Sequence, residues 1–149
     1  IKSLISSGDM QGKSISLLTS KKTSNKFKDL LDSLKVRLLT SLSPIELAKL
    51  YISSDFCIGA GGVSALERCC LGLPSGVVCI AENQYPGSVQ LEKKGCIKLL
   101  NNFPDLTVSI DIIKNLLNDD NQLKELSINS LNEVDGNGLK RILSEVESA

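Results

Sequence analysis

The sequence predicts an α/β fold with a parallel sheet covered by helices on both faces. Short apolar runs alternate along the chain with segments of helical periodicity, and helices alone follow towards the C-terminus. The run Gly76–Ile80 is continuously apolar, as expected of a strand buried on both faces. The connections are short, without a linker, a low-complexity segment or an internal repeat, so we expect residues 1–149 to form one domain.

The first forty residues predict two strands separated by a helix. Ile1–Ser7 is typical of the end of a helix, and Ser14–Thr19 alternates as a strand does. The polar stretch Ser20–Asn25 predicts a loop. One helical face follows, formed by Phe27, Leu30, Leu31 and Leu34. Val36–Leu39 predicts a second short strand.

A sharp helix start follows the Leu42-Ser43 turn. Ser43 precedes Pro44 and stands three residues before Glu46, which is a capping box with proline at the first helical position. We expect this helix to run to about Ser53.

The remaining elements alternate around a glycine-rich loop. They are a strand at Phe56–Ile58, a helix at Ser64–Leu71, the strand Gly76–Ile80, a helix at Gln84–Lys94, a strand at Cys96–Leu100, a helix from about Val108 to Leu117, and two helices beginning near Gln122 and Gly138.

Composition excludes several classes of function. Seventeen Lys and Arg balance seventeen Asp and Glu, and aromatic residues make up 3% with no Trp, so neither a global basic field nor stacking platforms point to nucleic acid. No apolar run approaches the ~18 residues of a membrane span, and no signal peptide is visible. Because the first residue is Ile1 rather than Met, we expect the natural N-terminus to be missing.

The cysteine and histidine counts bear on compartment and chemistry. Five cysteines without regular spacing do not form a disulfide framework, and in apolar patterns they are expected to be buried free thiols, which suggests the reducing cytoplasm. No metal site is expected, since there is no CxxC pair and no His. Without His, this chain cannot supply an imidazole general base.

The loop Gly59-Ala60-Gly61-Gly62 stands between a strand and a helix. Glycines let a ligand approach the backbone, and the following helix N-terminus offers free N–H groups, a combination that suits phosphate. The alternative is a tight turn without a ligand. The loop is neither GxGxxG nor a Walker loop, so it predicts neither a dinucleotide site nor a P-loop NTPase.

Three polar residues near this loop each have a structural and a functional interpretation. With Ser64 as N-cap, Glu67 would complete a capping box, which the local pattern favours. Alternatively, its carboxylate would accept hydrogen bonds from two ribose hydroxyls. Asn83 and Gln84 follow the buried strand, so they would edge the same crevice and bind sugar hydroxyls, or Asn83 would simply cap a helix.

The stretch from Ala48 through Gly62, continuing through Glu67-Arg68-Cys69-Cys70-Leu71-Gly72-Leu73-Pro74 to Ala81-Glu82-Asn83-Gln84, resembles the UDP-sugar hydrolases of pseudaminic acid biosynthesis. Those enzymes act on UDP-2,4-diacetamido-2,4,6-trideoxy-β-L-altropyranose and are related to GT-B glycosyltransferases. The segment Val134–Gly138 is also similar. The resemblance spans about residues 14 to 145 and is strongest from Tyr51 to Gln84.

The resemblance implies the C-terminal half of a GT-B fold, a Rossmann-like parallel sheet flanked by helices that holds a UDP-sugar. The implied roles are diphosphate binding by the backbone of Gly61, Gly62, Val63 and Ser64, ribose binding by Glu67, uracil binding near Leu42 and Ser43, and sugar binding by Asn83 and Gln84. The catalytic His would belong to a missing N-terminal domain, so this chain alone would bind rather than catalyse. No cofactor is implied.

Two departures from the family pattern are visible. Val63, Ser64 and Leu66 stand where relatives often have Ser, Thr and Trp, so a side-chain hydroxyl contact at position 63 is lost, although the backbone N–H groups would remain. The family's first strand of this domain has no counterpart, so the sheet would lack a strand or close up without it. A GT-B glycosyltransferase and a non-catalytic nucleotide-sugar-binding module remain alternative functions.

Overall fold

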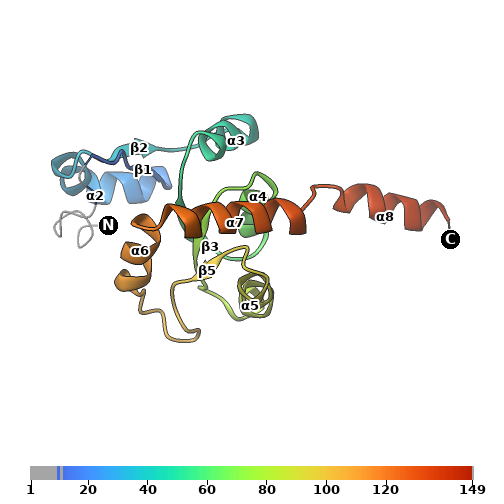
Figure 1. Cartoon of the computed structure of the whole chain (residues 1–149). Coiled ribbons are helices and arrows are strands. Elements are labelled where there is room, and N and C mark those ends of the chain that lie inside the picture. The colour runs from blue at the N-terminus through green and yellow to red at the C-terminus, as the bar shows by residue number, and fades with distance from the viewer. Residues whose placement is uncertain (1–9, 11, 149) are drawn as a thin grey trace. The chain divides into compact units, whose positions relative to one another are not determined.

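The computed structural model describes residue 10 and residues 12–148, without the side chains of residues 23–27. The helix end expected at Ile1–Ser7 lies outside the described residues. The fold is α/β, with two parallel sheets flanked by helices, as the alternation predicted (Figure 1). The chain forms two compact units, Ile1–Leu50 and Tyr51–Ala149. The expectation of one domain stays a prediction, because contact units can belong to one domain.

The first unit contains a two-stranded parallel sheet and its connecting helix. Strand β1 (Ser16–Leu18) pairs with β2 (Arg37–Leu39), and α2 (Lys21–Ser33) connects them. The expected loop at Ser20–Asn25 is wrong, since α2 begins at Lys21. Polar residues such as lysine are good helix formers, so a helix can start well before its first apolar position.

The capping box at Ser43 is confirmed at the start of α3 (Pro44–Ile52). The Ser43 backbone N–H donates to Glu46 Oε2 at 2.8 Å, and the Glu46 N–H donates to Ser43 Oγ at 3.3 Å. These reciprocal bonds satisfy two groups that a helix start would otherwise leave without partners.

The second unit contains a three-stranded parallel sheet of order β3-β4-β5. Its elements are β3 (Cys57–Ala60), α4 (Val63–Cys70), β4 (Ser75–Val78), the 3-10 helix η1 (Glu82–Gln84), α5 (Tyr85–Lys93) and β5 (Lys98–Leu99). The single sheet expected from the sequence is therefore wrong for the described residues. Among the described residues, β1 and β2 form one ladder and β3, β4 and β5 form another.

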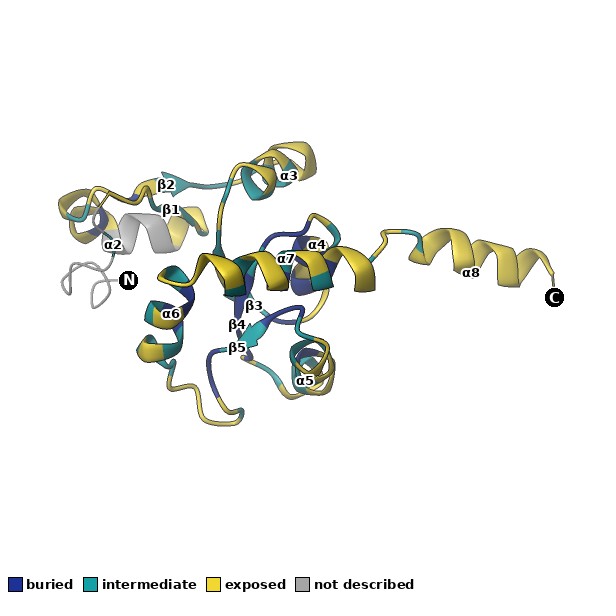
Figure 2. Cartoon of the chain, viewed as in Figure 1, coloured by how far each residue is buried: buried dark blue, intermediate teal, exposed yellow. Residues whose placement is uncertain are grey.

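Three C-terminal helices complete the second unit: α6 (Ile110–Leu117), α7 (Asp120–Glu133) and α8 (Gly138–Glu147). The core between the sheet and its helices is formed by Ala65, Cys69, Val77, Cys96 and Ile97. Helix α8 has no buried residue and is exposed along its length (Figure 2). Among the described residues, no helix is both long and apolar enough to cross a membrane.

Candidate functional site

The glycine loop turns the chain from β3 into α4 at Gly62. Gly62 is the N-cap of α4, with φ 75° and ψ −149°, a combination essentially restricted to glycine. The expected cap at Ser64 is therefore wrong, and with it the Ser64–Glu67 capping box. The physical reason is that the strained glycine turns the chain two residues earlier, which places Ser64 inside the first helical turn.

At Gly59 and Gly61, the other two glycines of the loop, close packing within the chain leaves no room for a side chain, and this packing involves no ligand. A Cβ on Gly59 would lie 2.8 Å from Nη1 of Arg68, and a Cβ on Gly61 would lie 2.7 Å from Oγ of Ser88. The same added Cβ on Gly61 would also lie 3.3 Å from the Cβ of Gln84. Internal packing thus accounts for Gly59 and Gly61, and backbone conformation accounts for Gly62.

The start of α4 presents backbone N–H groups beside this loop. The Ala65 N–H donates to the Gly62 carbonyl at 3.0 Å. The N–H groups of Val63 and Ser64, at the first two helical positions, have no acceptor within the helix. Gly62, Val63 and Ser64 are exposed, whereas Gly61 is buried. This arrangement is chemically suited to an anion.

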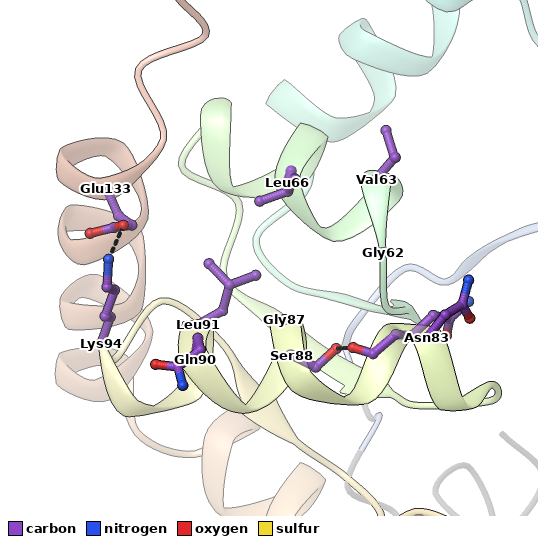
Figure 3. A pocket seen from close by; sticks show the side chains of 11 residues that line it. Gly62, Val63, Leu66, Asn83, Gly87, Ser88, Gln90, Leu91, Lys94 and Glu133 are labelled. Carbon is purple, nitrogen blue, oxygen red and sulfur yellow. Dashed lines mark hydrogen bonds and ion pairs between the residues drawn. The ribbon is translucent and has the colours of Figure 1, made fainter. Parts of the chain in front are cut away.

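A groove opens next to these residues, between α4 and α5 (Figure 3). It has a volume of about 380 Å³. Four of the residues singled out from the sequence line it: Gly62, Val63, Asn83 and Gln84. Leu66 and Leu91 form an apolar wall, and the ion pair between Lys94 and Glu133 lies at one end. Gly61, Ser64 and Glu67 are not among the lining residues.

The amide residues Asn83 and Gln84 belong to η1, directly after the buried strand β4. Asn83 is exposed and does not cap α5, since the N-cap of α5 is Gln84 and no side chain bonds there. The Ile80 N–H donates to Gln84 Oε1 at 3.3 Å, so Gln84 is partly engaged within the chain. Asn83 is the freer of the two for a ligand.

Glu67 is exposed on α4, and its carboxylate takes part in none of the hydrogen bonds or ion pairs found among the described residues. Leu42 and Ser43 belong to the first unit. The Ser43 hydroxyl donates to Glu46 Oε2 at 2.6 Å, which commits that side chain to the helix cap.

Sequence reasoning missed one buried charged residue, Arg68. Its side chain is 2% exposed, and its guanidinium donates from Nη2 to the Ala60 carbonyl at 2.8 Å. The signal was its position three residues after Ala65 and one before Cys69, on the apolar face of α4.

The five cysteines are free thiols. Burial raises the pKa of Cys57, Cys69 and Cys96, and the positive charge of Arg68 offsets only part of this for the first two. Within the part of the chain that the structure describes, no group of three or more His, Cys, Asp or Glu could hold a metal ion.

No protein-family model matches the chain, and a search of curated proteins finds no significant match.

Proposed function

We propose that this chain is the UDP-sugar-binding, C-terminal domain of a GT-B-type UDP-sugar hydrolase in pseudaminic acid biosynthesis. One observation carries the proposal: the free N–H groups at the start of α4 adjoin a groove that is also lined by the amides of Asn83 and Gln84. A diphosphate at the helix start would extend its sugar towards those amides. The parallel strands connected through helices agree with a Rossmann-like half of such an enzyme.

The chemistry assigned to this chain is binding and charge stabilisation. Backbone N–H groups of Gly62, Val63 and Ser64 would hold the diphosphate and stabilise it as the leaving group. The buried Gly61 would act through the turn that it forms. Hydrolysis also needs a base to activate water, and because this chain has no His, we assign that base to another domain. The free thiols suit the reducing cytoplasm as the place of action.

Glu67 is proposed as the ribose ligand, since its exposed carboxylate presents two acceptors to a diol. Leu42 and Ser43 are proposed to lie near the uracil, as the resemblance implies. Both the hydroxyl and the backbone N–H of Ser43 are already bonded to Glu46.

The test is calorimetric titration of UDP and of 2′-deoxy-UDP into the wild-type chain and the Glu67→Ala variant. We expect the variant to bind UDP about tenfold more weakly, as loss of a charged hydrogen-bond partner predicts. We also expect it to lose the preference for UDP over 2′-deoxy-UDP. Because Gly62 rather than Ser64 caps α4, the variant should be as stable as the wild type.

Glu125→Ala removes a carboxylate that is also exposed, from α7, and is the matched control. Equal UDP affinity in all three proteins would reject Glu67 as ribose ligand, and no UDP binding by the wild type would reject the proposed function. In a longer protein that includes the proposed catalytic domain, UDP release from UDP-sugar without an acceptor supports hydrolysis. Release only with an acceptor would instead identify a transferase, and binding without turnover a non-catalytic module.

A further inference from the structure

The guanidinium of Arg68 lies directly behind the glycine loop. Nε donates to Oγ of Ser75 in β4 at 3.1 Å, and Nη2 donates to the carbonyl of Ala60, the last residue of β3, at 2.8 Å. Nη1 occupies the space that a Cβ on Gly59 would need. Arg68 therefore links α4 to both neighbouring strands immediately before the chain turns at Gly61 and Gly62.

Among the described residues, the charge of Arg68 has no carboxylate partner. None of the ion pairs formed by the described residues includes it, and its hydrogen-bond acceptors are a carbonyl and a neutral hydroxyl. The nearby thiols of Cys57 and Cys69 have raised pKa values, so they do not neutralise it either. An unpaired buried charge opposes folding, and an apolar side chain of similar volume would avoid that cost. A buried charge bonded to Ala60 in the glycine loop therefore indicates a use for the charge.

The direction of the side chain suggests that use. Arg68 lies in the second turn of α4, and its guanidinium reaches back to the residue at which β3 ends. Its full positive charge is thus added at the end of α4 where the helix already carries a partial positive charge. Arginine stays protonated at all physiological pH values, so this charge is permanent.

We propose that Arg68 is a positioning residue of the phosphate site. It fixes the Gly59–Gly62 loop by its bond to Ala60 and provides a buried positive charge behind the N–H groups that receive the diphosphate. It acts through the loop and needs no contact with the ligand. The inference rests on the proposed function, because it concerns the affinity of the same site for a diphosphate.

The test compares UDP with uridine, which lacks the phosphates, in the wild type, Arg68→Met and Arg68→Lys. We expect Arg68→Met to weaken UDP binding by about tenfold or more, with a change of less than about twofold for uridine. The UDP affinity of Arg68→Lys should lie between those of the wild type and Arg68→Met. Lysine keeps the charge but lacks the planar guanidinium that donates to Ala60 and Ser75 at once. Equal loss of UDP and uridine binding would mean a purely structural role and would overturn the proposal.

Ser130→Ala is the matched control. It removes the buried hydroxyl that donates to the Cys96 carbonyl at 2.7 Å, so it loosens the core without touching the loop. We expect it to lower the unfolding temperature and to leave the ratio of UDP to uridine affinity unchanged. If Arg68→Met fails to fold by circular dichroism, Arg68→Gln replaces it, since glutamine is neutral and its amide nitrogen, near the position of Arg68 Nε, can still donate to Ser75.

A second readout separates failure of this inference from failure of the proposed function. If the wild type does not bind UDP, the proposed function fails. Inorganic pyrophosphate is then titrated while the amide NMR signals of Gly62, Val63 and Ser64 are followed. Shifts that occur in the wild type and vanish in Arg68→Met support an anion-positioning role, whereas equal shifts, or none, overturn it.

Discussion

Gly62 determines where α4 begins, and its backbone conformation is the strongest local constraint in the candidate site. With its φ of 75° and ψ of −149°, Gly62 turns the chain from β3 into the first turn of α4. Space is not the constraint, because a Cβ there would meet only Gln84 Cγ at 3.7 Å. Whatever glycine contributes at this position is therefore conformational.

The Gly62→Ala variant separates the effect of backbone conformation from that of the space available for a side chain. We expect it to lower the free energy of unfolding by about 1–3 kcal/mol, the cost of holding a non-glycine residue in this region. The control is Gly87→Ala within α5, where a Cβ has nothing within 4 Å and φ is not positive. That change should be neutral or slightly stabilising. Chemical denaturation measures both, and equal stabilities would contradict the conformational argument.

Residue patterns predicted which amino acids gather at the site better than they predicted their roles. Gly62, Val63, Asn83 and Gln84 do line one groove, because parallel strands end at the same edge of a sheet. The Ser64–Glu67 spacing misled, since a capping box in sequence cannot reveal that a glycine two residues earlier already turns the chain. Arg68 escaped notice because charged residues are rarely fully buried.

At the scale of elements, the start of α3 responds to pH through Glu46. The hydrogen bonds from the Ser43 hydroxyl and backbone N–H lower the pKa of the Glu46 carboxyl below its usual value. A carboxyl with a depressed folded-state pKa contributes stability at pH values above its unfolded pKa. That contribution is lost as the pH falls through the folded-state pKa.

The corresponding experiment compares the wild type with Glu46→Gln across pH. We expect the wild type to have the higher unfolding midpoint near neutral pH, and the difference to disappear well below the ordinary glutamate pKa of about 4.3. The effect should be small because the pair is exposed. A difference that persists in acid would mean that the cap does not depend on the ionised carboxylate.

The predicted boundaries of helices and strands agree with the structure where a capping motif marks the boundary, and they differ from it elsewhere. The box at Ser43 fixed the start of α3 to the residue. In contrast, α2 starts at Lys21 within a stretch that has polarity but no capping signal, and helical propensity there was underestimated. The strand expected at Cys96–Leu100 shortens to Lys98–Leu99 because the Cys96 N–H bonds back to the Leu91 carbonyl of α5.

At the scale of the whole molecule, buried apolar side chains are distributed unevenly between the two units. In the described part of Ile1–Leu50, the buried hydrophobic residues are Leu31 and Val36. The described part of Tyr51–Ala149 contains eleven, including Val77, Leu100 and Leu116. Hydrophobic burial is the main favourable term in folding, so the second unit should hold most of the stability. No sequence pattern showed this, because both halves predict strands and helices of similar apolar character.

Native-state hydrogen exchange tests this uneven stability in the intact chain. The Arg37 N–H donates to the Ile15 carbonyl at 2.9 Å at the start of the β1–β2 ladder. We expect this amide to exchange at least about tenfold faster than the amides of Val77 and Leu100 in the second unit. The ladder has little apolar cover, so local opening there need not disturb the core around Val77. Mild denaturant should leave the β1–β2 exchange nearly unchanged and accelerate exchange at Val77, because only global unfolding exposes the latter. Equal protection in both sheets, with the same denaturant dependence, would show one cooperative unit and would favour the single domain that the short connections predict.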